Sequence, residues 1–376
     1  MSVRSYPLHS LIEGSWFKLI CGASYQHSTA VRSLALAYAL AGADCIDVAA
    51  DLAVITAAQE GIKVAAKLSK DKARNKSPWL MVSINDGEDP HFRKAQFDAT
   101  QCPSDCPQPC IKVCPANAIE ISSQISSSGV IDRLCYGCGR CLPICPSELI
   151  FTRSHISTPR MVLPWIEEKG IDAIEIHTQV GHYDDFKRVW QDIAPKVSQL
   201  KLLAISCTED EGVIDYLRSL YDLISPLPCP LIWQTDGRSM SGDIGKGTTH
   251  MAISFAQKVL EAKLPGYVQL AGGTNDYTVT KLNTAQMLRQ PQSNNSVSGV
   301  AYGSYARSIL SPILEKLEIT DQHNFKTQPN LNQNQLMNQF IQLEQNSELL
   351  KQAVEIASHL VNQIKSIPDL SSSSSS

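Results

Sequence analysis

The fold of the middle of the chain is decided by two runs of cysteine, which read CPSDCPQPCIKVCP from Cys102 to Pro115 and CYGCGRCLPICP from Cys135 to Pro146. Together they contain eight of the twelve cysteines of the chain. Closely spaced thiols followed by proline are typical of iron-sulfur ligation, because a cluster presents neighbouring iron atoms that a tight loop must surround. Glycines between the cysteines of the second run give its backbone the freedom for such a loop.

The second run has the spacing of bacterial ferredoxins, in which three close cysteines bind one cluster and the fourth binds the other. Two runs therefore predict two clusters with exchanged fourth ligands. The first predicted set is Cys135, Cys138, Cys141 and Cys114, and the second is Cys102, Cys106, Cys110 and Cys145. Zinc knuckles and a disulfide framework are the alternatives. Repeated runs of four thiols with proline favour iron, and the lack of a secretory leader pattern disfavours disulfides.

The first run departs from the ferredoxin pattern by one extra residue in each of its first two gaps. Pro103, Pro107 and Pro109 would interrupt a helix, so we expect a wide loop. Such a loop leaves the cluster type open: at least one cluster is expected to be [4Fe-4S], and the other is [4Fe-4S] or [3Fe-4S]. Each run continues into a short apolar segment, which predicts an inserted dicluster ferredoxin-like α+β domain at residues 87–155.

Composition limits the classes of function that remain. The chain has 376 residues, 43% of them hydrophobic and 19% charged, and a net charge of −4, which argues against a nucleic-acid partner. It has no apolar stretch long enough for a transmembrane segment. We therefore expect a cytoplasmic protein of a reducing compartment, with any membrane association peripheral. The four other cysteines lie in apolar runs and are expected to be small buried side chains: Cys21, Cys45, Cys207 and Cys229.

On both sides of the cysteine runs, short β-branched segments alternate with amphipathic ones. Eight such pairs predict a TIM-type (β/α)8 barrel, with an open doubly wound α/β sheet as the alternative. The expected strands are residues 17–23, 45–50, 79–84, 173–177, 201–207, 230–235, 266–271 and 298–302. The expected helices are residues 28–41, 51–69, 160–169, 184–199, 211–224, 248–263, 276–288 and 305–317. Residues 1–86 and 156–320 would form the barrel, and the cluster domain would be inserted after its third strand.

Polar residues gather where the predicted strands end, which is where barrels bind ligands. They are Ser24, Asn85, Asp86, His177, Gln179, Glu209, Asp210, Asp236, Arg238, Thr274 and Asn275. His177 is a candidate general acid or an ordinary strand-end histidine. A weak phosphate site is predicted at Gly272, Gly273, Gly303 and Ser304, with flavin mononucleotide (FMN) as its candidate cofactor; simple turn chemistry is the alternative.

The composition changes beyond residue 320. Residues 321–376 are predicted to form a Gln/Asn-rich linker, an amphipathic helix from Leu336 to Ile364 and a serine tail. The apolar stripe of this helix has three candidate roles: docking on the barrel, pairing with a second chain, or binding a partner.

Three features together resemble the light-dependent period modulator (LdpA) family of cyanobacteria. They are the opening WFKLICGASYQ from Trp16 to Gln26, the two cysteine runs, and LAGGTN from Leu270 to Asn275. The resemblance implies an iron-sulfur protein in the input of the circadian clock, which adjusts period to light through the redox state of photosynthetic electron transport, in particular the plastoquinone pool. It also implies a clock input histidine kinase and core clock proteins as partners, a quinone or photosynthetic electron carrier as electron partner, and a place at the thylakoid surface.

Two functions follow as hypotheses. In the first, the eight cysteines form the sensing element of a redox sensor. In the second, the chain is an oxidoreductase whose clusters pass electrons to a flavin or a small substrate at the barrel mouth. The sequence shows no clear acid-base arrangement, which favours the sensor over the enzyme.

Overall fold

A computed structural model describes twelve segments of the chain. They are residues 6–21, 31–69, 77–87, 93–114, 118–121, 129–132, 134–135, 141–154, 159–237, 248–289, 295–327 and 342–366. Three of the predicted site residues, Cys138, Ser24 and Arg238, lie outside these segments.

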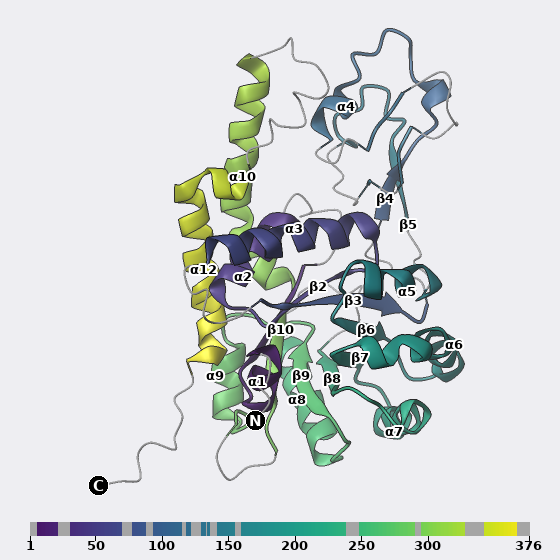
Figure 1. The fold of residues 1–376 in the computed structure, drawn as a ribbon, viewed down its shortest axis with the longest axis vertical. Helices are drawn as coiled ribbons and strands as arrows, with labels where there is room; N and C mark the ends of the chain where they lie inside the picture. Colours follow the sequence, from purple (N-terminus) through teal and green to yellow (C-terminus); the bar gives the residue numbers. More distant parts are fainter. Residues whose placement is uncertain are drawn as a thin grey trace.

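Eight parallel strands close into a barrel in the order β1-β10-β9-β8-β7-β6-β3-β2 (Figure 1). Pairing of Trp16 with Gly299 and of Lys18 with Ala301 joins the first strand to the last. The strands are β1 (Trp16–Ile20), β2 (Cys45–Ala49), β3 (Trp79–Asn85), β6 (Ala173–His177), β7 (Leu202–Thr208), β8 (Leu231–Asp236), β9 (Tyr267–Ala271) and β10 (Gly299–Tyr302). The TIM-type barrel is confirmed, and the open sheet is wrong.

Helices follow the strands and cover the outside of the barrel, as the alternating pattern predicts. They are α2 (Val31–Ala41), α3 (Leu52–Leu68), α5 (Pro159–Glu168), α6 (Tyr183–Ile193), α7 (Val213–Ile224), α8 (Thr248–Glu261), α9 (Thr278–Thr284) and α10 (Ser304–Thr327), with a 3₁₀ turn, η3 (Ala194–Gln199), after α6. The start of α3 is fixed by Asp51, whose carboxylate accepts hydrogen bonds from the backbone N–H groups of Ala53 and Val54.

The amino-terminal end of the barrel is closed by a helix that the sequence analysis did not predict. Helix α1 (Tyr6–Ile12) places Leu8 and Leu11 against the interior side chains Trp16, Trp79 and Leu202. With only seven residues, α1 is too short to show a helical period in the sequence. It gives this end of the barrel an apolar lining.

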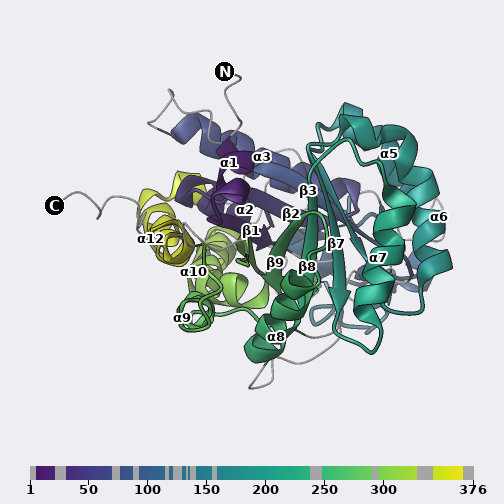
Figure 2. The same ribbon diagram turned by 90° about the horizontal axis from the view of Figure 1, so that it is seen from below.

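The carboxyl-terminal helix docks on the barrel, which confirms the first of its three candidate roles. Helix α12 (Ser347–Lys365) packs on α2 and α10, and its buried residues join the main core (Figure 2). Ion pairs fix its two ends: Arg32 Nη2 lies 2.5 Å from Glu344 Oε1 in the preceding turn η4 (Leu343–Gln345), and Lys365 Nζ lies 2.5 Å from Asp44 Oδ2.

The helix begins later than predicted, because Asn346 caps it. Helix α10 is longer than predicted and runs to Thr327, into the expected linker.

The segment between β3 and α5 forms a separate small module (Figure 1). Its antiparallel strands β4 (Arg93–Gln96) and β5 (Phe151–Ser154) pair with each other in a two-stranded sheet, and the chain between them includes the short helical turns η2 (Ala99–Gln101) and α4 (Pro109–Val113). Of the two expected apolar segments, the one after the second cysteine run includes β5, and in the described part of the one after the first run Ile119 forms a bridge with Val130. Because it follows β3, the module leaves the barrel at the carboxyl ends of the strands.

Candidate functional site

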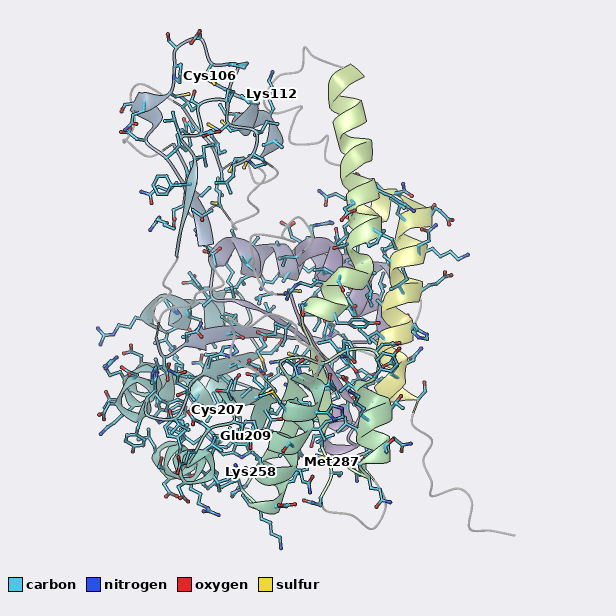
Figure 3. The ribbon with its side chains drawn as sticks, turned by 180° about the vertical axis from the view of Figure 1, so that it is seen from behind. Cys106, Lys112, Cys207, Glu209, Lys258 and Met287 are labelled. Carbon is cyan, nitrogen blue, oxygen red and sulfur yellow. The ribbon has the colours of Figure 1, made fainter. Side chains whose placement is uncertain are left out.

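The cysteines of the two runs form the centre of the small module. Cys110, Cys114, Cys135 and Cys141 are buried and make up four of the ten buried residues of its core. The other described cysteines of the runs, Cys102, Cys106 and Cys145, are partly exposed. Figure 3 shows Cys106 in the part of the module farthest from the barrel. The expected wide loop is confirmed, since Cys102 and Cys106 lie in turns and only Cys110 lies on a short helix.

The four cysteines of the second predicted set are close enough to influence one another. The thiol of Cys102 is hydrogen-bonded to Cys106; burial raises its pKa, and the charges of Cys106 and Cys145 raise it further. Burial likewise raises the pKa of Cys110, and Cys145 and Cys102 add to the effect. A thiol whose pKa is raised in this way forms a stable thiolate when a cation compensates the charge, which is what bound iron does.

The described members of the first predicted set share the module core. Cys114 Sγ accepts a hydrogen bond from the backbone N–H of Ala118 at 3.2 Å, an interaction that stabilises a thiolate ligand. Cys135 is held by its own N–H, which donates to Ile131 O at 3.1 Å.

These residues fit an iron-sulfur group. The ten buried residues in the described part of the module make a small core, which cross-links would stabilise, and its described cysteines form no disulfide. Within the described segments, no three His, Cys, Asp or Glu side chains converge tightly enough to hold a metal ion, and Cys138 is not among them.

A buried lysine joins the module to the barrel. Lys94 on β4 is 1% exposed, and its Nζ lies 2.6 Å from Oδ2 of Asp51, the residue that caps α3. The same ammonium lies 2.7 Å from the carbonyl oxygen of Asp132 and 3.4 Å from its carboxylate. Asp132 precedes Cys135 by three residues and also pairs with Arg153 on β5.

Inside the barrel, polar side chains from several strands form one buried network near the carboxyl ends. Lys18 Nζ pairs with Glu175 and lies 3.3 Å from Asp47 Oδ2, while Ser83 Oγ donates to Asp47 at 2.5 Å. Glu175 Oε1 lies 3.1 Å from His177 Nε2. Burial alone would lower the pKa of Lys18, but the charges of Asp47 and Glu175 outweigh it and raise that pKa.

Two glutamines extend this network across the barrel. Gln234 Nε2 lies 2.9 Å from Glu175 Oε1, 3.2 Å from Ser206 Oγ and 3.3 Å from Asp236 Oδ1. Gln269 donates to Gln234 Oε1 at 2.6 Å and accepts from Trp16 Nε1 at 2.7 Å. Burial raises the pKa of Asp236 to about 7, although hydrogen bonds from Ser206 and Gln234 oppose the shift.

Comparison with known proteins assigns the chain to a family. Residues 165–363 match the family model of the Light dependent period A C-terminal domain, and residues 102–156 match that of the LdpA Fe-S cluster-binding domain. A protein of Synechococcus elongatus named Light dependent period A is 51% identical over 314 residues, which cover 83% of this chain and 86% of that protein. The chain belongs to the LdpA family.

Solved structures similar to this LdpA-family chain include two tryptophan synthase alpha chains of Legionella pneumophila. Their TM-scores are 0.42 and 0.40, each at 10% identity; they cover 98% and 97% of this chain, and both are matched over 100% of their own length. A likeness at this level indicates nothing about chemistry in the barrel.

The family match supports the iron-sulfur prediction, while the ligand sets and the number and type of clusters stay predictions. No helix in the described part of this LdpA-family chain has the length and apolar character needed to cross a membrane.

The predicted phosphate glycines of the LdpA-family barrel have a packing explanation. Gly272 and Gly273 have positive φ, and a Cβ would come within 2.8 Å of Gly237 N in the first case and 2.5 Å of Thr248 in the second. Gly303 lies between β10 and α10 without such crowding, and Ser304 is the first residue of α10. FMN binding stays a prediction, and turn chemistry accounts for the first two residues.

The other predicted strand-end residues separate into two groups in the LdpA-family barrel. His177 and Asp236 enter the buried network. Asn85 ends β3, where it pairs with His177 in the sheet. The other described residues contact neighbours outside the network: Asp86 with His182, Gln179 with His182, Glu209 with Lys258, both labelled in Figure 3, Asp210 with Glu211, Thr274 with Ala301, and Asn275 with Thr249.

Sequence reasoning missed most of the network. A signal was present: the apolar runs of five strands each contain a polar residue, and in β8 two more polar residues follow it. The five interior residues are Lys18, Asp47, Glu175, Gln234 and Gln269. Because alternate residues of a barrel strand face the interior, this pattern predicts a polar barrel centre.

Of the cysteines outside the runs, Cys21, Cys45 and Cys207 are buried as predicted, and Cys229 is partly exposed.

Proposed function

We propose that this protein is an iron-sulfur redox sensor in the light input of the circadian clock, in which the state of the clusters is passed from the module to the barrel. Membership of the LdpA family supports the proposal, as does the relative named Light dependent period A. An iron-sulfur cluster supplies one-electron chemistry and holds its ligand cysteines together.

The observation that carries the proposal is the buried pair between Lys94 and Asp51. Cys135 is hydrogen-bonded to Ile131, the neighbour of Asp132, so a change in the ligation of Cys135 displaces the turn that holds Asp132. Asp132 shares the Lys94 ammonium with Asp51. Asp51 in turn holds the first N–H groups of α3, and four residues earlier Asp47 belongs to the barrel network.

These contacts give the module a direct influence on the barrel. When a cluster binds Cys135, Asp132 and Asp51 hold the Lys94 ammonium from both sides. When the cluster releases Cys135, Lys94 loses its contact with Asp132, and the start of α3 loses part of its support. Segments with weakened contacts open more often, which a binding partner can detect.

The same proposal includes the partners. A clock input histidine kinase and core clock proteins would receive the signal, and a quinone of the plastoquinone pool or another photosynthetic electron carrier would supply electrons at the thylakoid surface.

The experiment compares anaerobically prepared wild-type protein with Cys135→Ser and with the control Cys229→Ser, which changes a cysteine outside the runs. Electron paramagnetic resonance during a potentiometric titration should show one cluster signal fewer in Cys135→Ser and an unchanged spectrum in Cys229→Ser. Hydrogen exchange at Leu52–Ile55 should differ between oxidised and reduced wild-type protein, and this difference should be lost in Cys135→Ser. Equal exchange at Leu52–Ile55 in both redox states of the wild type would refute the proposed transmission.

A further inference from the structure

The carboxyl-end half of the barrel interior is charged, although packing does not require charge there. Interiors of such barrels are ordinarily filled by layers of apolar side chains. Apolar side chains do fill the amino-terminal half of this barrel. Above that layer, Lys18 and Glu175 are fully buried and Asp47 is 2% exposed. A buried ion pair is on average no more stabilising than apolar residues of equal volume, so stability alone does not explain these charges.

Among the described residues, the charges of the network do not balance. Asp47, Glu175 and Asp236 provide three carboxylates, and Lys18 provides one ammonium. With all three carboxylates ionised the sum is −2, and protonation of His177 would bring it to −1. His177 is also the member of the network that reaches solvent, with 18% of its side chain exposed.

In the part of the network that the structure describes, hydrogen-bond acceptors also exceed donors. The Lys18 ammonium is shared between Glu175 and Asp47, and the amide nitrogen of Gln234 is divided among three oxygen atoms. Asp47 Oδ2 is buried and has the Lys18 ammonium at 3.3 Å, but it accepts no hydrogen bond from any described residue. A ligand that supplies both N–H donors and positive charge would satisfy this network.

We propose that the mouth of the barrel binds a small organic cation with an alkylammonium or guanidinium group, held by Asp236 and the Glu175–His177 pair. A divalent metal ion fits less well, because the ammonium of Lys18 already lies against both Asp47 and Glu175 and would repel it. The place agrees with the general position of ligand sites at the carboxyl ends of barrel strands. This proposal concerns the barrel alone and does not rest on redox sensing by the clusters.

Proton release should accompany binding. Burial raises the pKa of Asp236 to about 7. The groups that act on it are Ser206 on β7, Gln234 on its own strand, Glu175 on β6 and Lys18 on β1, and the Cys207 thiol lies nearby. A bound cation favours the carboxylate, so binding below pH 7 displaces a proton from Asp236 and the affinity rises as the pH approaches 7.

Isothermal titration calorimetry on the full-length, anaerobically prepared protein tests the proposal. Agmatine and ethylammonium are the probes, and acetate and inorganic phosphate are the anionic comparisons. Wild-type protein should bind at least one cation, with a heat at about pH 6 that depends on the ionisation enthalpy of the buffer. Asp236→Asn should weaken this binding roughly 30-fold or more. The control Asp215→Asn, at an exposed carboxylate of α7, should leave it unchanged.

A second variant covers the case in which Asp236→Asn does not fold. Ser206→Ala removes a hydrogen bond to the Asp236 carboxylate and should move the midpoint of the pH dependence upward by about one unit. Failure of both cations to bind the wild type, tighter binding of phosphate than of either cation, or an unchanged affinity in Asp236→Asn would overturn the proposal. An unshifted midpoint in Ser206→Ala would do the same.

Discussion

Replacing Lys94 by methionine should destabilise the protein, because this lysine is buried between the module and the barrel. Methionine keeps much of the volume of the side chain but removes the ammonium that lies 2.6 Å from Asp51 and 2.7 Å from the carbonyl oxygen of Asp132. The Asp51 side chain is only 5% exposed, so water cannot replace the lost partner well.

The expected loss of unfolding free energy depends on the contacts that Asp51 and Asp132 keep in the variant. Removal of one member of a buried ion pair costs about 3–5 kcal/mol. Asp51 still accepts hydrogen bonds at 3.0 and 3.3 Å from the backbone of α3, and Asp132 is 45% exposed and still pairs with Arg153. These contacts place the expected loss at the lower end, about 3 kcal/mol.

A double-mutant cycle measures this pair in holoprotein prepared without oxygen. Asp51→Asn is the matched change, because asparagine is also a good helix cap. Urea unfolding is followed by circular dichroism for the barrel and by visible absorbance for the clusters. The loss of unfolding free energy in the double variant Lys94→Met/Asp51→Asn should be about 2 kcal/mol smaller than the sum of the losses in the two single variants. A loss below about 1 kcal/mol in Lys94→Met, or strict additivity, would contradict the proposed coupling of module and barrel.

Two further predictions concern the barrel. The pKa of Asp236 is about 7 in the folded protein against 3.8 normally, so the folded state keeps a proton that the unfolded state releases. The wild type should therefore lose up to about 4 kcal/mol of stability relative to Asp236→Asn as the pH rises from about 4 to 7. If urea unfolding gives the same difference in unfolding free energy between the two proteins at both pH values, this is disproved. Leu360→Ala on α12 should cost about 3 kcal/mol, since Leu360 is buried in the main core, whereas Lys351→Ala at an exposed position of the same helix should change the unfolding free energy by less than about 0.5 kcal/mol; equal effects would show that α12 is not docked in solution.

The barrel could be predicted from the sequence because each of its strands is a short β-branched run followed by an amphipathic helix. Closure of the barrel could not be predicted in this way. It depends on pairing between Trp16 on the first strand and Gly299 on the last, and periodicity does not encode that pairing. Helix α1 and strand β4 were missed because segments of seven and four residues are too short to show a period.

The cysteine site could be predicted because the spacing of the cysteines reflects the shape of the iron-sulfur cluster that they bind. The barrel network was not predicted, because Lys18 and Glu175 are separated by 157 residues and pair only once the barrel has closed. Lys94 was missed for the same reason: nothing near it in the sequence shows that it faces Asp51 across the module boundary. Single polar residues inside apolar strands were the one local sign of the network.

The antiparallel pairing of β4 with β5 has a consequence for the evolution of this architecture. Arg93 and Ser154 face each other in the ladder, so the chain enters and leaves this sheet of the module at points about one strand spacing, or ~5 Å, apart. A short turn can bridge that gap. A barrel ancestor could therefore have acquired the whole electron-handling unit through a single genetic insertion, and a descendant could discard it through a single deletion, without rearranging any other strand.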